Sequence, residues 1–250
     1  MPSTENERLL SEHQPNAVRA RLAGPVKAST LPDAVLGGID GCVTTFAVVS
    51  GAFGAGFSPQ VALVLGFANL IADGFSMAVS NYEAGQAQLN QIKFAERTER
   101  EHIRAVPEGE REEIGQLFQA KGFDGELLEQ VVEAISRNPD VWVATMLREE
   151  YGLSGAGLSP RRAALTTFAA FLSVGALPLL PYAIPGMESQ IQFLTSLGLA
   201  GVVFLGIGML KSIVYGLPAM RSGLRTLIMG TAAAGLAFAT GHFAQGLLGG

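Results

Sequence analysis

Five long apolar runs, separated by polar stretches, organise this chain. They cover approximately residues 34–56, 60–80, 163–182, 191–210 and 225–247. Each run approaches the roughly 20 residues that an α-helix needs to cross a bilayer. The stretch between the second and third runs is highly charged and keeps a helical pattern. The pattern predicts an all-α, polytopic membrane protein with five transmembrane helices and a helical insert between spans two and three.

The alternation of polar and apolar stretches divides the chain into four parts. We expect an N-terminal segment at residues 1–32, spans one and two at 33–92, the insert at 93–152 and spans three to five at 153–250. The N-terminal segment lacks the positive-then-apolar order of a signal peptide. Its composition fits either a short amphipathic helix on the membrane surface or a disordered tail.

Turn signals predict where helices begin. Ser58 and Pro59 favour a helix start soon after the first apolar run, so spans one and two should form a tight antiparallel hairpin. After Gly85 no glycine or proline interrupts the chain before Pro107, so span two should continue into the insert as one helix. The starts of three further insert helices are predicted at Pro107, after Asp124 as the capping residue, and at Pro139.

Positive charge predicts the orientation. All 17 Lys and Arg residues lie in the N-terminal segment, in the insert and its flanks, or around the turn between spans four and five. Because positive charge marks cytosolic segments, the N-terminus and the insert should be cytosolic and the C-terminus outside. Lys211, near that last turn, is expected to extend towards the cytosolic interface. The net charge of -5 gives no basic face for nucleic acid.

Small residues, glycines and a cysteine among them, lie in the first span. Gly37 and Gly41 form a GxxxG pair, which fits either packing within the chain or contact with a second chain. Cys42 is the single cysteine, which excludes an internal disulfide and a zinc site built from cysteines. We expect it to pack as a small apolar residue.

Two carboxylates interrupt the apolar runs of the first hairpin. Asp40 lies about 10 Å along the helix from the polar start at Asp33. Asp73 and Met77 are four residues apart in the second run and therefore share one helix face. Because a charged aspartate inside a membrane costs about 3 kcal/mol, such residues mark functional sites. The pattern indicates a path lined by oxygen and sulfur atoms.

Closely spaced polar pairs recur in the insert. Three pairs lie three or four residues apart, each on one helix face: Glu99 with His102, Glu110 with Glu113, and Met146 with Glu150. Carboxylate, imidazole and thioether groups together suit Fe(II), Mn(II), Co(II) or Zn(II) better than Ca(II) or Mg(II). The alternative is a solvated helix surface with ion pairs such as Glu96 with Arg100.

Four motifs together resemble the vacuolar iron transporter family. They are GGIDGCVTTFAVVSG in span one, ANLIADGFSMAVSNY in span two, and P-E-G-E-x-E-E-I and W-V-x-x-M-x-x-x-E in the insert. The resemblance extends over about residues 30–248. It implies a homodimeric, proton-coupled exporter that moves Fe(II), and often Mn(II), out of the cytosol.

The resemblance also assigns residues. The membrane path would comprise Asp40, Asp73 and Met77, with Asn81 near the cytosolic entrance. The metal ligands of the insert would be Glu99, His102, Glu110, Glu113, Met146 and Glu150. This chain departs from the family pattern at His102 and Asn81, where family members often carry glutamate. His102 would make the insert site less negative and more sensitive to pH near neutrality.

We therefore expect a secondary transporter rather than an enzyme. It would need no prosthetic group; Fe(II), with Mn(II), Co(II) and Zn(II) as alternatives, would be the cargo and H+ the coupling ion. The competing hypotheses are a passive metal channel, a membrane-anchored iron sensor or scaffold, and a membrane-bound metal-dependent enzyme. The sequence contains no phosphate-binding loop that would indicate ATP. The short chain without a targeting peptide suggests the plasma membrane of a prokaryote.

Overall fold

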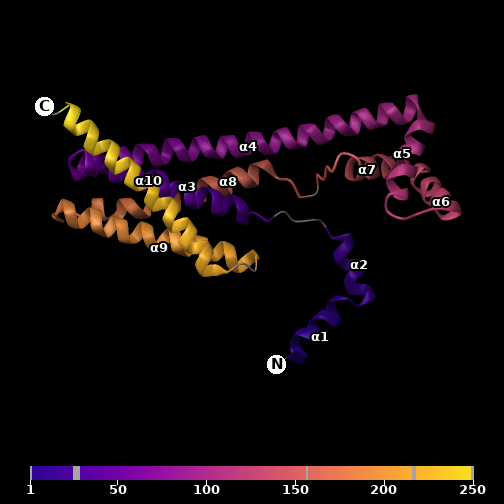
Figure 1. The fold of residues 1–250 in the computed structure, drawn as a ribbon, viewed down its shortest axis with the longest axis horizontal. Helices are drawn as coiled ribbons and strands as arrows, with labels where there is room; N and C mark the ends of the chain where they lie inside the picture. Colours follow the sequence, from indigo (N-terminus) through magenta and orange to yellow (C-terminus); the bar gives the residue numbers. More distant parts are fainter. Residues whose placement is uncertain (1, 25–28, 156, 216–217, 249–250) are drawn as a thin grey trace. The chain divides into compact units, whose positions relative to one another are not determined.

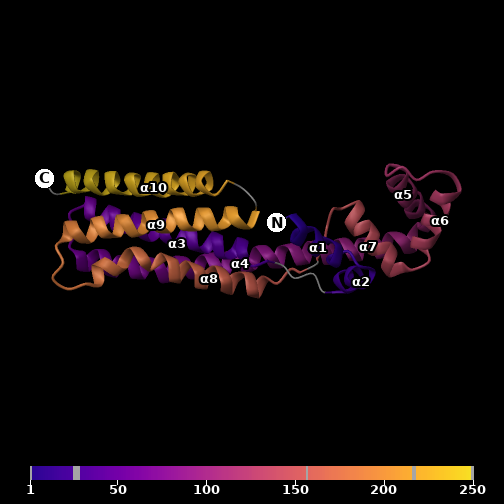
Figure 2. The ribbon, with the colours of Figure 1, turned by 90° about the horizontal axis from the view of Figure 1, so that it is seen from below.

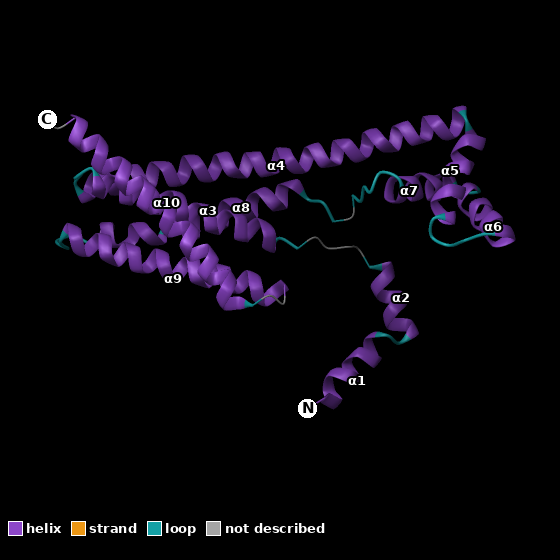
Figure 3. Cartoon of the chain, in the orientation of Figure 1, coloured by secondary structure: helices purple, strands orange, loops and turns teal. Residues whose placement is uncertain are grey.

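The computed structural model describes residues 2–24, 29–155, 157–215 and 218–248. Within these ranges all regular structure is helical, which confirms the predicted all-α class (Figures 1 and 3). The residues cluster into two compact units. One comprises Ser29–Gln86 and Ser159–Gly250, and the other Met1–Ala28 and Ala87–Leu158. We call the first the transmembrane unit, and residues 87–158 of the second the insert.

The transmembrane unit is a helical bundle arranged around α3. Its elements are α3 (Leu31–Gly54), the first part of α4 (Pro59–Ala105), α8 (Pro160–Gly175), the 3-10 helix η1 (Leu177–Ala183), α9 (Ser189–Tyr215) and α10 (Ala219–Leu248). Among the described residues, four helices are long and apolar enough to cross a membrane, and α8 with η1 makes a fifth span if the bent pair is counted as one. Helix α3 packs against α8, α9 and α10 (Figure 2).

The GxxxG pair of α3 packs within the chain. A Cβ atom on Gly37 would collide with the backbone of Thr167, and one on Gly41 with the backbone of Phe171, both in α8. Absence of a side chain therefore lets α3 and α8 touch backbone to backbone. Cys42, the next residue, is fully buried in the apolar core of the unit, as expected.

Span three, predicted from the sequence at about residues 163–182, is not one continuous α-helix. Helix α8 ends at Gly175, and η1 follows at an angle of 40°. Pro178 and Pro181 explain the change, because proline has no N–H to donate and its ring clashes with the preceding helical turn. The buried Ser196 hydroxyl of α9 donates a hydrogen bond of 2.7 Å to the carbonyl oxygen of Pro178.

The insert contains the last part of α4 together with α5 (Pro107–Gln119), α6 (Gly125–Ser136) and α7 (Pro139–Glu149). Helix α4 runs unbroken for 47 residues, which confirms that span two continues into the insert. The predicted starts at Pro107 and Pro139 are also confirmed. Asp124 precedes α6 as expected, but its side chain makes no capping hydrogen bond.

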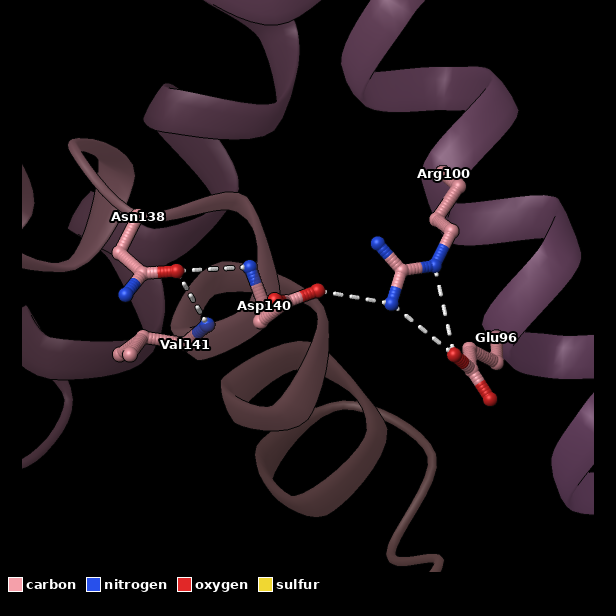
Figure 4. A network of polar contacts seen from close by, with 5 residues as sticks. All are labelled: Glu96, Arg100, Asn138, Asp140 and Val141. Carbon is pink, nitrogen blue, oxygen red and sulfur yellow. Dashed lines mark hydrogen bonds and ion pairs between the residues drawn. The ribbon is translucent and has the colours of Figure 1, made fainter.

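Two features hold the helices of the insert together. Ile114 of α5 packs with Trp142 and Met146 of α7 in a small apolar core. On the surface, Arg100 of α4 donates to Glu96 at 3.0 Å, as expected, and also to Asp140 at the start of α7 at 2.9 Å (Figure 4). The Asn138 side chain in the same view accepts hydrogen bonds from the first backbone N–H groups of α7 and caps that helix.

The N-terminal segment forms two short helices, α1 (Pro2–Glu12) and α2 (Pro15–Ala23). Pro15 occupies the first position of α2, where its missing N–H breaks no helical hydrogen bond. The segment is thus helical in two pieces, not one. Its location on a membrane surface stays a prediction.

Candidate metal-binding sites

The insert brings five predicted polar side chains into one neighbourhood. Glu99 and His102 come from the end of α4, Glu110 and Glu113 from the first turns of α5, and Glu150 directly follows α7. Their charges are close enough to influence one another. We call Glu99, His102, Glu110, Glu113 and Glu150 the insert cluster.

Two carboxylates of this cluster are buried. Glu99 is only 1% exposed and Glu110 only 3%. Oε1 of Glu99 accepts a hydrogen bond of 2.9 Å from the Tyr151 hydroxyl, and Oε1 of Glu110 lies 3.4 Å from Nδ1 of His102. The second oxygen of each carboxylate is buried without a hydrogen-bond partner among the described residues. A buried, unpartnered carboxylate oxygen is costly unless a proton or a cation satisfies it.

The electrostatics of the cluster favour binding of a proton or a cation. Burial, together with the charges of Glu99 and Glu113, raises the pKa of Glu110 to about 7, although His102 opposes the shift. The same causes raise the pKa of Glu150. Burial and the hydrogen bond to Glu99 raise the pKa of the Tyr151 hydroxyl, so it remains a donor. A divalent cation would relieve this mutual repulsion of carboxylates.

The side chains of the insert cluster lie near one another but do not form an assembled coordination shell. In the part of the chain that the structure describes, no three His, Cys, Asp or Glu side chains are already placed to hold one metal ion. His102, Glu113 and Glu150 are exposed, which leaves their side chains free to turn towards an ion. Met146 is fully buried in the apolar core with Trp142, so its sulfur packs against carbon atoms.

The predicted residues of the membrane path lie within the transmembrane unit. Asp40 of α3 and Asp73 of α4 are both half-buried, and their charges are close enough to interact. Met77 packs against the apolar core of this unit. Asp40 also lines a cavity of about 410 Å³ between α3 and α9, to which Lys211 of α9 contributes as well. The chain thus presents two carboxylates and a thioether inside an apolar helical bundle.

Asn81 has a more structural position than the sequence suggests. Its amide nitrogen donates to Oδ1 of Asp33 at 2.9 Å and to the hydroxyl of Thr167 at 2.7 Å. These two bonds connect α4 to the start of α3 and to α8. They support the predicted antiparallel arrangement of the first two spans, because Asn81 follows the apolar part of α4 and Asp33 is early in α3.

Comparison with known proteins identifies the family. The model of the VIT family matches residues 31–242, which include all four motifs and both candidate sites. The chain belongs to the VIT family. The vacuolar iron transporter 1 of Oryza sativa subsp. japonica is 32% identical over 209 residues, which are 82% of this chain and 82% of that protein. The protein of the same name from Tulipa gesneriana is 28% identical over 98% of this chain and 96% of its own.

Two polar residues beside the candidate sites of this VIT-family chain, Asn69 and Tyr151, were not predicted from the sequence. Asn69 lies four residues before Asp73, and its side-chain nitrogen is buried without a partner among the described residues. Asn69, Asp73 and Asn81 therefore share one face of α4 with Met77, and this regular spacing was a usable signal. Tyr151 was not predictable in this way, because its contact with Glu99 joins positions 52 residues apart.

Proposed function

We propose that this protein moves Fe(II) out of the cytosol in exchange for protons, with Mn(II), Co(II) and Zn(II) as possible further cargo. Membership of the VIT family supports the general function, transport of iron or another divalent metal across a membrane. We infer three further properties, namely export, proton coupling and the use of Mn(II), from the chemistry of the sites.

The observation that carries the proposal is the pair of interacting carboxylates, Asp40 and Asp73, within apolar helices. A helix that only anchors a domain gains nothing from a buried aspartate, which costs about 3 kcal/mol at mid-membrane. Protons and metal ions compete for the same carboxylate oxygens. A proton arriving from the far side would release the metal outward, and return of the protonated state would carry H+ inward.

The insert would supply the metal to this path. Its buried carboxylate oxygens on Glu99 and Glu110 attract a cation, and the exposed members of the cluster can complete the shell. Borderline metals such as Fe(II) accept carboxylate and imidazole ligands together, which favours them over Ca(II). Met146 would join the shell only if the apolar core of the insert opened, so we assign the main role to the carboxylates and His102.

The proposal also includes the oligomeric state of the protein and its orientation in the membrane. We propose a homodimer, because five spans give no internal two-fold repeat and a symmetric path would need two chains. The N-terminus and insert would face the cytosol. The similar plant proteins are named vacuolar, and for this chain the plasma membrane of a prokaryote stays a prediction.

The test is Fe(II) uptake into sealed proteoliposomes under anaerobic conditions, with and without a pH gradient. Wild type should take up Fe(II) faster with the gradient and move protons the opposite way, and Asp40→Ala should abolish both fluxes. Glu83→Gln, which removes an exposed carboxylate from α4, is the matched control and should transport normally.

Other outcomes would select the rival functions. Uptake that ignores the gradient would indicate a passive channel. Iron binding without any uptake would indicate a sensor or scaffold. Product formation from a substrate without net metal movement would indicate an enzyme.

A further inference from the structure

A second cavity of the transmembrane unit is lined by positive charge. It has a volume of about 450 Å³ and lies among α3, α9 and α10. Lys211 at the end of α9 and Arg221 and Arg225 at the start of α10 contribute the charge. The distribution of positive charge along the chain accounts for basic residues at this end of the spans, but not for three of them around one cavity.

These cations have no acidic partner nearby in the sequence. Residues 189–250, which include both α9 and α10, contain no Asp or Glu at all. Among the described residues, no ion pair involves Lys211, Arg221 or Arg225. The guanidinium groups of arginine present planar sets of donors that match the oxygens of a phosphate. The cavity is therefore suited to a phosphate group from outside the chain.

The other wall of the cavity is apolar. Ile39 and Val43 of α3 and Met229 of α10 line it. Arg221, Arg225 and Met229 are spaced by four residues, so charge passes into apolar surface along one stripe of α10. Ile228 and Met229 are each 59% exposed, which continues the apolar surface beyond the cavity. A ligand with a phosphate at one end and a hydrocarbon chain at the other would match both halves.

We propose that this cavity binds the phosphate headgroup of an anionic phospholipid, with an acyl chain along the apolar stripe of α10. Basic residues at the ends of transmembrane helices mark the cytosolic side, whose leaflet carries anionic lipids. Free inorganic phosphate has the same charged oxygens as the headgroup. It has no apolar part that could contact Ile39, Val43 and Met229.

The site lies next to the proposed metal path. Lys211 lines both this cavity and the cavity that contains Asp40. A bound headgroup would offset the positive charge of Lys211 and so favour cations beside Asp40. This consequence rests on the proposed transport function, whereas lipid binding itself does not.

The test measures lipid retention by the purified full-length protein. Mixed micelles would contain phosphatidylglycerol or phosphatidylcholine, and native mass spectrometry would count the lipids retained. Wild type should retain phosphatidylglycerol preferentially. Arg221→Gln combined with Arg225→Gln should weaken retention about 25-fold, at about fivefold for each charge removed. The control is Arg161→Gln combined with Arg162→Gln, which removes the same charge from exposed positions at the start of α8.

Each outcome decides the proposal. Retention that is lost only in the α10 variant, and that millimolar inorganic phosphate does not displace, supports the lipid site. Equal loss in both double variants would mean diffuse attraction to surface charge and would overturn it. Displacement by inorganic phosphate would make phosphate itself the ligand and would also overturn it. Should the α10 pair fail to fold in a thermal unfolding assay, Arg225→Gln alone should lose about fivefold.

Lipid retention and Fe(II) uptake are measured in separate assays, so that failure of one proposal can be told from failure of the other. Faster gradient-driven Fe(II) uptake in phosphatidylglycerol vesicles, but not in those of the α10 variant, would support the effect on Lys211. Preserved lipid retention without any Fe(II) uptake would reject the proposed function and leave the lipid site standing.

Discussion

The two acidic regions of this VIT-family chain are built by opposite strategies. The transmembrane unit places two interacting carboxylates, Asp40 and Asp73, among helices that touch through glycine. The insert gathers four carboxylates and a histidine around a core of only a few apolar side chains. The first region has few ligands, on helices whose backbones are in close contact. The second has surplus ligands and exposed side chains that can turn.

This difference suggests a division of labour. A site that holds an ion for passage must release it again, which a small number of ligands in a rigid frame allows. A site that collects an ion benefits from many mobile carboxylates. Four predictions on three variants test whether rigidity does belong to the transmembrane unit and adjustability to the insert.

The largest effect is expected at the contact between α3 and α8. Gly41→Ala adds one methyl group that would meet the backbone of Phe171, which cannot move aside without shifting a helix. We expect a loss of about 2–3 kcal/mol in stability. Gly235→Ala is the matched control, because a Cβ atom at Gly235 meets nothing within 4 Å. Thermal unfolding in detergent measures both, and equal midpoints would contradict backbone contact between α3 and α8.

A smaller effect is expected at Glu110 of the insert. Its pKa of about 7 lies above the ordinary value of 4.5, so the folded insert binds more protons than the unfolded chain between these values. The metal-free insert should therefore lose stability as pH rises from about 4.5 to 7. Glu110→Gln should weaken this dependence, to which Glu150 also contributes through its raised pKa, and should gain on the order of 1 kcal/mol at pH 8, as measured by unfolding at several pH values.

The same variant should bind Fe(II) less well. Loss of one buried carboxylate ligand should weaken binding about tenfold at pH 7.5. Wild-type affinity should fall as pH decreases below about 7, because protons then compete for Glu110. Anaerobic calorimetry on the full chain measures this, with Glu129→Gln as the exposed control on α6. Equal affinities for the two variants would remove Glu110 from the proposed shell.

The smallest effect is expected at the surface of the insert. Arg100→Gln breaks the ion pairs of Arg100 with Glu96 in the same helix and with Asp140 of α7, but the groups involved are exposed and screened by solvent (Figure 4). Amide hydrogen exchange in the first turn of α7 should rise about threefold, without a change in Fe(II) affinity. Arg97→Gln, an exposed neighbour on α4, serves as control. A large loss of iron binding in Arg100→Gln would make this network part of the site.

The helices were predictable from sequence because their signals are local. Pro59, Pro107 and Pro139 each open a helix where expected, and the unbroken α4 follows from the lack of glycine and proline after Gly85. The bend after Gly175 could have been predicted as well, since Pro178 and Pro181 fall within the span.

Contacts between distant parts of the chain were harder to predict from the sequence. The sequence left open whether Gly37 and Gly41 face α8 or a second chain, because spacing identifies a smooth helix surface and not its partner. Likewise, Asn81 was assigned to the metal path, whereas its donors are engaged by Asp33 and Thr167. The burial of Met146 in the apolar core of the insert depends on how α5 and α7 meet, which spacing within one helix does not report.

The break in the third span has a consequence for the order of assembly. Proline leaves backbone carbonyl groups without helical partners, and a membrane offers no water to satisfy them. Here the hydroxyl of Ser196, in the following span, supplies a hydrogen bond to the carbonyl of Pro178. During biosynthesis span three emerges first and must wait for span four before this bond can form. We therefore expect the third span to enter the bilayer stably only together with the fourth.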